Sequence, residues 1–223
     1  MTDAFKIMMK DIKLAFKYDN TNFLMFLLPL FVSFLKFKYS NNVFTADIHI
    51  ITGSFSLYTV SLIIAGLISK EEATKASLTI RNLPLKQSSI VIGRYLFTAT
   101  IILIVSILSS LFQVIKSIME NDISYLILSI YDCIIFCIPL FSILFPLIFK
   151  FGYFKIHLIF IFINLCIVFT PYILIAFKVY NILSPVVDII YNTIDIVEAN
   201  YATVFSCSLI LYILSLIVSV KTY

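Results

Sequence analysis

Two places in this sequence of 223 residues carry acidic side chains at spacings that could support chemistry. Glu71 and Glu72 are adjacent, as in intramembrane proteases that combine a glutamate pair with an arginine four residues later and with histidines on other helices. The arginine position is Ala76 here, so the motif is incomplete. His49 and His157 lie at the ends of apolar runs, where an amphipathic ring is common. We therefore expect neither a protease nor a catalytic or metal-binding histidine.

Asp132 is the acidic residue that lies deep inside an apolar run. A charge at mid-bilayer costs roughly 2.5–3.5 kcal/mol on insertion scales, so it usually faces the bundle interior or water. One interpretation is a proton-relay or substrate-contact site. The other, which we favour, is that the span begins near Cys133 and leaves Asp132 on an interfacial turn. Gln113 and Asn164 are milder intramembrane polar residues, for which interhelical hydrogen bonding is a sufficient explanation.

Cofactor chemistry has no support in the residue pattern. The sequence has no glycine-rich phosphate loop, so we expect no nucleotide site on this chain. The cysteines fall inside apolar runs without metal-ligand spacing to either histidine, and buried thiols are the expected form. They are Cys133, Cys137, Cys166 and Cys207. We expect no catalytic residue, no metal site and no cofactor bound by this chain.

The composition indicates a membrane protein. Hydrophobic residues make up 61% of the chain and charged residues only 13%, whereas soluble domains carry about 25% charged residues. Uncharged runs of about 20 residues match the length that crosses a bilayer core as helix. The net charge of +4 does not indicate nucleic acid, because lysines collect beside membrane spans and fix topology.

We therefore expect an all-α polytopic membrane bundle, with residues 1–223 as a single transmembrane domain of six helices. The expected spans are Asn22–Phe37, Ile48–Ser69, Tyr95–Ile115, Ile123–Phe149, Ile156–Phe177 and Ala202–Val220. The first is the weakest, because it is short, contains Pro29 and ends beside two lysines. Pro139, Pro146 and Pro171 fall inside later spans, where prolines commonly kink helices.

The positions of the positive charges give an orientation. Of the 16 Lys and Arg residues, all but four fall on one set of loops if both termini lie on that side. The four exceptions are Lys36, Lys38, Lys116 and Lys178. Because cytoplasmic loops carry the excess of Lys and Arg, we expect a multi-pass protein with both termini in the cytoplasm.

Two further segments have amphipathic helical patterns. In residues 3–17 the apolar and the basic side chains occupy separate faces at about 100° per residue, as in helices that lie in the membrane interface. The apolar face holds Phe5, Met8, Met9, Ile12 and Phe16, and the basic face holds Lys6, Lys10, Lys13 and Lys17. In residues 178–201, Asp188, Asn192 and Asp195 lie opposite an apolar face. We expect a short extracellular helix there.

Residues 70–94 form the longest polar stretch and are expected in the cytoplasm. A solvated helical stretch begins at Glu71. Asn82-Leu83-Pro84 interrupts it, because proline disfavours helix in the residue before it. A second helical segment can then run from Lys86 into the third span. We call residues 70–94 the elbow.

With these features the sequence resembles the ABC-2 type permeases, the membrane subunits of ABC exporters, and within them the small bacterial six-span branch. The resemblance covers nearly the whole chain and rests on an acidic–lysine stretch after span two, a Leu-Pro, and a hydrophobic-Gly-Arg-Tyr motif before span three. These are Glu71-Glu72-Ala73-Thr74-Lys75, Leu83-Pro84 and Val91-Ile92-Gly93-Arg94-Tyr95. Lys86-Gln87-Ser88-Ser89 departs from the family pattern, in which a Ser/Thr cap precedes basic and acidic residues.

The resemblance implies a mechanism. The chain would sit in the bacterial cell membrane and pair with an identical or sister permease to give twelve spans. A separate cytoplasmic ATPase would carry ATP and Mg, dock under the elbow and transmit its closure to the spans. The residues that the resemblance places in this coupling are Glu71, Glu72, Lys75, Leu83, Pro84, Ile90, Gly93 and Arg94. The path would suit a hydrophobic or amphipathic substrate, such as a membrane-active peptide.

Other functions remain open on the sequence. An immunity or sensor permease that clears or detects an antimicrobial peptide would have the same topology. An ion- or proton-coupled transporter would use Asp132, and a membrane scaffold would transport nothing. The abundant Phe, Ile and Leu of the spans fit an apolar cargo, and they fit lipid-facing helices equally well.

Overall fold

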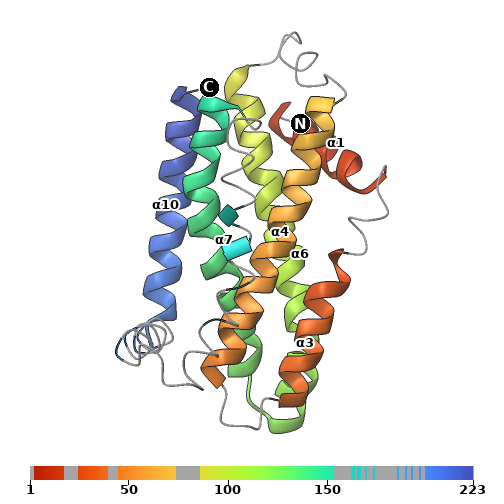
Figure 1. The fold of residues 1–223 in the computed structure, drawn as a ribbon, viewed down its shortest axis with the longest axis vertical. Coiled ribbons are helices and arrows are strands. Elements are labelled where there is room, and N and C mark those ends of the chain that lie inside the picture. The colour runs from red at the N-terminus through yellow and green to blue at the C-terminus, as the bar shows by residue number, and fades with distance from the viewer. Residues whose placement is uncertain are drawn as a thin grey trace.

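The computed structural model describes residues 3–17, 25–39, 45–73, 86–152 and 199–222, with isolated positions between 162 and 196. Its elements are α1 (Asp3–Lys17), α3 (Leu27–Tyr39), α4 (Thr45–Ala73), α6 (Gln87–Glu120), α7 (Ser124–Phe151) and α10 (Tyr201–Thr222). In Figure 1, α4, α6, α7 and α10 run along the long axis, and α3 lies beside the lower part of α4 and α6. α1 crosses the upper end, where both termini lie.

Four helices are long and apolar enough to cross a membrane: Ile51–Glu71, Gln87–Glu120, Ser129–Phe151 and Tyr201–Thr222. They correspond to the second, third, fourth and sixth expected spans, and the described part of the chain contains helices without strands. The expectation of an all-helical membrane bundle is therefore confirmed.

The expected count of six spans is not confirmed. The helix in the first expected span, α3, has 13 residues and is about 20 Å long, which is shorter than a hydrocarbon core of about 30 Å. The fifth expected span, 156–177, and the expected extracellular helix, 178–201, lie outside the described residues except at isolated positions and the last three residues. The helix expected at 3–17 is present as α1.

The two arms of the elbow are continuations of membrane helices. α4 extends to Ala73 and α6 begins at Gln87, so only residues 74–86 separate them, of which 74–85 lie outside the described chain. The expected helical run from Lys86 into the third span is confirmed by α6. At its other end α6 stops at Asn121, which has a φ of 53°, a left-handed conformation that asparagine tolerates better than most residues.

Apolar side chains from α4, α6 and α7 form the core, which includes Ile63, Leu67, Ile101 and Phe141. The two helices α4 and α7 pack closely at Gly53 of α4, where a Cβ atom would lie 2.3 Å from the ring of Phe136 in α7. A side chain at position 53 would therefore push α4 away from α7.

A serine side chain attaches α3 to α6. The Ser33 hydroxyl oxygen of α3 accepts a hydrogen bond of 3.1 Å from the backbone N–H of Phe112 in α6. The Ser109 and Ser110 hydroxyls, one turn earlier, donate to carbonyls of their own helix at 2.9 Å. Serine hydroxyls that donate to carbonyls of their own helix often bend membrane helices. A bend in this part of α6 would keep it in contact with the short α3.

Candidate coupling site

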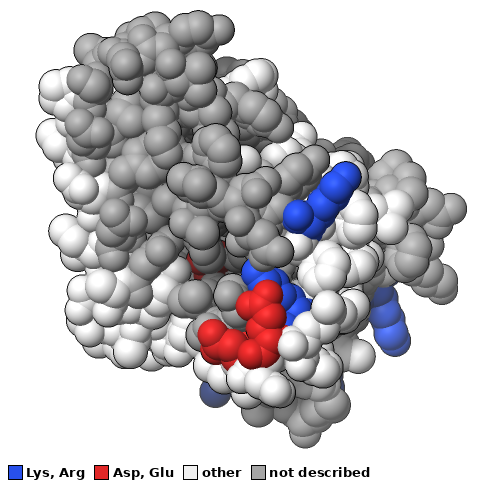
Figure 2. Space-filling model, turned by 90° about the horizontal axis from the view of Figure 1, so that it is seen from below, with Lys and Arg blue, Asp and Glu red and all other residues white. Residues whose placement is uncertain are grey.

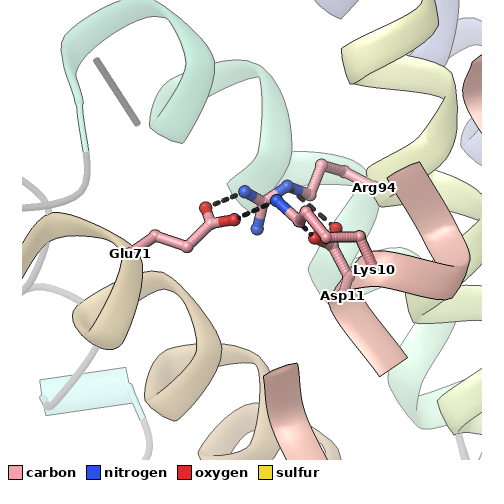
Figure 3. A network of polar contacts seen from close by, with 4 residues as sticks. All are labelled: Lys10, Asp11, Glu71 and Arg94. Atoms are coloured by element: carbon pink, nitrogen blue, oxygen red, sulfur yellow. Dashed lines mark hydrogen bonds and ion pairs between the residues drawn. The ribbon is translucent and has the colours of Figure 1, made fainter. Parts of the chain in front are cut away.

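Four charged side chains join α1 to the helix ends that flank the elbow (Figure 3). We call Lys10, Asp11, Glu71 and Arg94 the charged cluster. Lys10 Nζ lies 2.6 Å from Glu71 Oε1 and 3.0 Å from Asp11 Oδ1. Arg94 Nε lies 3.2 Å from Asp11 Oδ2, and the same guanidinium also pairs with Glu71 Oε2. Each acid thus contacts both bases, and three helices meet at one point.

Burial makes this balance of charge important. The Asp11 and Glu71 side chains are 0% and 4% exposed, against 13% for Arg94 and 36% for Lys10. Breaking a buried ion pair by removing one partner typically costs about 3–5 kcal/mol, because it leaves an uncompensated charge. With two acids and two bases the cluster is neutral as a whole, so it tolerates burial only while it is complete.

The two bases are not equivalent. Burial lowers the pKa of the Lys10 ammonium; attraction to Asp11 opposes this only in part, and repulsion from Arg94 adds to it. A guanidinium cannot be deprotonated in proteins. Arg94 is therefore the permanent counter-ion of the two buried acids, and Lys10 is the more exposed and more easily neutralised one.

α1 docks through small side chains. Ala4 and Ala15 are buried in this helix, together with Ile7, Met8 and Asp11. A Cβ atom on Gly93 of α6 would lie 2.8 Å from Ile7 and 2.9 Å from the carbonyl oxygen of Ala4. Glycine at position 93 is therefore what allows α1 to lie against α6, directly beside the arginine that holds it.

The docked face of α1 coincides only in part with the apolar face that the sequence pattern emphasised. Of the predicted apolar face, Met8 is buried and Met9 is exposed. Phe5, Ile12 and Phe16 are partly buried and pack against the core. Lys6 and Lys13 are exposed on a third sector. A helix with one sector against protein, one apolar and one basic is suited to the membrane interface, and that location stays a prediction.

The expectation that Glu71 begins a solvated stretch is wrong. Its carboxylate is buried because Lys10 and Arg94 close over it. Ile90, in the other arm, is also buried. Glu72 lies in the last turn of α4, and its side chain is outside the described residues, as are Lys75, Leu83 and Pro84. The coupling role of the elbow stays a prediction.

Tyr95 links α6 to the opposite side of the bundle. Its hydroxyl lies 2.6 Å from Ser215 Oγ and 2.8 Å from Ser219 Oγ, both in α10. Ser215 Oγ donates a hydrogen bond of 2.6 Å to the carbonyl of Ser142 in α7. That carbonyl lacks its usual helical donor because residue 146, four positions later, is proline.

Counting hydrogens fixes the direction of this chain of bonds. Each hydroxyl has one hydrogen. Ser215 gives its hydrogen to the Ser142 carbonyl, so Tyr95 must donate to Ser215, and Ser219 must donate to Tyr95. The order Ser219 to Tyr95 to Ser215 to Ser142 therefore joins α10, α6 and α7 in one directed chain, which we call the hydroxyl chain.

Asp132 is helical and buried. α7 begins at Ser124, two turns before it, and the side chain of Asp132 lies inside the candidate span Ser129–Phe151. The Tyr201 hydroxyl of α10 donates to Asp132 Oδ1 at 3.5 Å. The turn that we favoured from sequence is therefore wrong, whereas the position of Asp132 near the membrane interface stays a prediction. Gln113 is buried, and Asn164 lies outside the described residues. A transport role for any of the three stays a prediction.

The charged residues at the far end of the bundle surround the turn between α6 and α7. Lys116 is buried and its Nζ lies 3.7 Å from Glu120 Oε1. Glu120 and Asp122 are exposed, and Figure 2 shows the acidic side chains gathered on this end with lysines beside them. Cys166 and Cys207 are exposed, contrary to expectation, whereas Cys133 and Cys137 are buried. The described residues include no group of three metal-ligating side chains.

Comparison with known families decides the class of this bundle. A family model described as ABC-2 family transporter protein matches residues 6–223. The chain belongs to the ABC-2 transporter family. It is therefore a membrane permease component of an ABC transporter, and its family implies an ABC ATPase as partner. ABC-2 permeases are membrane transport subunits and generally not themselves catalytic. Neither a curated protein nor a solved structure matches the chain.

In this ABC-2 permease, sequence reasoning missed Lys10 and Asp11 as partners of the elbow. One signal could have found Asp11. It lies four residues after Ile7 and four before Ala15, so an acid interrupts an otherwise small and apolar helix sector. The serines of α10 gave no comparable signal, because their partners are backbone and side-chain atoms of distant helices.

Proposed function

We propose that this ABC-2 permease is the membrane subunit of an exporter, and that its ATPase drives it through the elbow. The charged cluster carries the proposal, because it braces both arms of the elbow and α1 together. When the ATPase moves the residues between Ala73 and Lys86, the cluster then transmits this movement to α4 and α6, and the helix ends do not bend. Both termini lie at the elbow end (Figure 1), and the excess of Lys and Arg on these loops supports a cytoplasmic location.

The cluster also indicates that different residues of the elbow have different roles. Glu71, which is buried with its intrachain partners, braces the elbow and does not reach the ATPase. Contact with the ATPase falls to Leu83, Pro84 and the neighbouring apolar side chains. Exposed ion pairs are worth only about 0–1 kcal/mol each, so apolar docking dominates this interface.

The proposed cargo is a hydrophobic or amphipathic molecule, carried between this chain and a second permease that is identical or a sister subunit. We further propose that, among such permeases, the chain resembles the staphylococcal phenol-soluble-modulin exporter permease. That similarity favours a cytolytic or antimicrobial peptide as cargo. The nearly uncharged spans are compatible with such a substrate.

Two measurements test this function. The purified chain alone should hydrolyse no ATP, and it should co-purify with a cytoplasmic ABC ATPase when the two are expressed together. Replacing Leu83 and Pro84 together by alanine should lower ATP-driven transport at least tenfold without removing the protein from the membrane. The matched control replaces Ile118 and Met119, which are exposed at the far end of α6. Normal transport by the elbow variant would show that the elbow is not the coupling element.

An immunity or sensor permease is the second candidate, because the same fold and partner would serve it. Deletion of the chain separates the two functions. Accumulation of the peptide inside cells supports export, whereas hypersensitivity to added peptide supports protection. A third candidate, an ion-coupled transporter, draws on the buried carboxylate of Asp132.

A further inference from the structure

We propose that α10 separates from α7 during transport and opens a polar-lined passage from the bundle interior into the bilayer, through which an amphipathic cargo moves sideways. This inference rests on the proposed transport of such a cargo. α10 stands at the edge of the bundle, beside α7 (Figure 1). Only 17% of the residues in its most apolar stretch are buried, against 61% of those in the corresponding stretch of α4. It is the described span with the least protein around it.

The inner face of α10 carries serine and tyrosine hydroxyls among apolar side chains, and its outer face is apolar. The inner positions recur every three or four residues, as one helix face does. They are Tyr201, Phe205, Ser208, Tyr212, Ser215 and Ser219. Leu211, Ile213, Leu214 and Ile217 are exposed on the other side. We call the contact between the inner face and its neighbours the α10 seam.

The α10 seam crosses almost the whole membrane. From Tyr201 to Ser219 the helix rises about 27 Å, close to the thickness of a hydrocarbon core of about 30 Å. Tyr201 bonds Asp132 at one end. Towards the other end the Tyr212 hydroxyl donates to the Tyr95 carbonyl at 2.8 Å, and the hydroxyl chain follows. Hydrogen bonds are therefore distributed along the contact.

This kind of contact can open. Helices in lipid gain no hydrophobic stabilisation from packing together, because the lipid chains are equally apolar, and their interhelical hydrogen bonds are individually weak. When α10 moves away, its apolar outer face stays in lipid. The opened seam presents hydroxyls and the Asp132 carboxylate to the polar, cationic face of an amphipathic peptide, while lipid chains cover the apolar face of the peptide.

State-dependent labelling tests the opening without reference to cargo. In the complete complex of permease and ATPase, the exposed Cys166 and Cys207 are replaced and Ser208, which is 3% exposed, is changed to cysteine. We expect a lipid-soluble maleimide to label Ser208→Cys at least tenfold faster during ATP turnover than without ATP. Equal rates in the two states overturn the proposal.

Matched positions control this experiment. Leu211→Cys, on the lipid face of α10, should be labelled at the same rate in both states, and Val105→Cys, buried in α6, in neither. Labelling of Val105→Cys during turnover would show general loosening of the bundle, which also overturns a movement specific to α10. The parent with only its buried Cys133 and Cys137 gives the background rate.

A cross-link between α7 and α10 tests whether transport requires the opening. Ser142→Cys in α7 and Ser215→Cys in α10 supply the two thiols. The positions are adjacent, because the Ser215 hydroxyl bonds the backbone carbonyl of Ser142 at 2.6 Å. Joining them with a short bifunctional thiol reagent should block transport of a fluorescent cationic amphipathic peptide in vesicles at least tenfold, and reduction should restore it. A monofunctional reagent of similar size is the control. Full transport after complete cross-linking overturns the sideways passage. An unlinked complex that moves no peptide instead shows that the proposed cargo is wrong.

Discussion

Arg94 and Tyr95 are neighbours in the sequence, and their side chains tie α6 to opposite sides of the bundle. Arg94 pairs with Asp11 of α1 and Glu71 of α4, whereas Tyr95 bonds Ser215 and Ser219 of α10. Gly93, just before them, makes room for α1. The Gly-Arg-Tyr motif is thus a junction at which three consecutive residues place four helices.

The two bases of the charged cluster should differ in importance. Arg94→Met leaves the buried acids with only Lys10, so we expect a loss of about 3–5 kcal/mol in the free energy of unfolding. Lys10→Met should cost clearly less, because burial already disfavours the charged form of Lys10. Thermal unfolding in detergent, followed by the loss of the monodisperse peak, measures both. Lys6→Met, which removes an exposed pair with Asp3 at 3.4 Å, is the control, and equal effects of Arg94→Met and Lys10→Met would contradict the assignment.

The contact between Asp11 and Arg94 should appear as thermodynamic coupling. Residues in one ion-pair network show interaction energies of about 0.5–3 kcal/mol in double-mutant cycles. Asp11→Asn and Arg94→Gln should each destabilise the chain, and together they should cost less than the sum. Unfolding midpoints of the four chains give the coupling energy. Additive losses would mean that α1 does not dock on α6 through this pair.

A side chain at position 93 should displace α1. Gly93→Ala places a Cβ against Ile7 and the Ala4 carbonyl, and backbone atoms cannot give way as a flexible side chain can. We expect a loss of about 1–3 kcal/mol, typical of overpacking, and faster thiol labelling of Ala15→Cys, a buried position. Leu96→Ala, at an exposed position of the same helix, should leave Ala15→Cys protected. Unchanged labelling in the Gly93→Ala chain would refute the close approach.

The hydroxyl chain should depend most on its central member. Tyr95→Phe removes one donor and one acceptor, whereas Tyr212→Phe removes one donor. Hydrogen bonds between membrane helices are worth on average about 0.6 kcal/mol each, so Tyr95→Phe should lower stability by roughly twice as much as Tyr212→Phe. Denaturation in mixed micelles compares the two matched variants. A larger loss in Tyr212→Phe would argue against the bond order derived above.

Asp132→Asn separates ATP-driven export from ion coupling. If the permease is powered by its ATPase, the variant should still transport with full dependence on ATP, and the apparent KM for a cationic peptide should rise a few-fold. Vesicle transport with ATP, and with an imposed proton gradient instead, measures both. Loss of transport in the variant, together with gradient-driven transport by the unchanged chain, would favour the ion-coupled alternative.

The sequence predicts the helices well and their contacts poorly, for a physical reason. Long apolar runs define α4, α6, α7 and α10, because few other structures place such runs in lipid. Within a membrane, however, lipid-facing and protein-facing positions are both apolar. The hydrophobic pattern of α1 therefore indicates the larger residues such as Met8 and Phe16 and misses Ala4 and Ala15, which are also buried.

The contacts of polar residues are equally hard to predict from the sequence. Glu71 looks solvated in the sequence, because its ion-pair partner Lys10 is 61 residues away. Asp132 looks like part of a turn, because nothing nearby in the chain shows that it lies in a helix with Tyr201 facing it. The family motifs mark positions 93–95 as important without saying which helices they join.

The free carbonyl that Pro146 creates has a consequence for how the protein is made. The hydroxyl that satisfies it belongs to Ser215, 73 residues further along the chain. During synthesis α7 is made before α10, so the Ser142 carbonyl is at first without its Ser215 donor. A chain that ends before α10 keeps this carbonyl without its donor, so α10 completes the hydrogen bonding of a helix made before it.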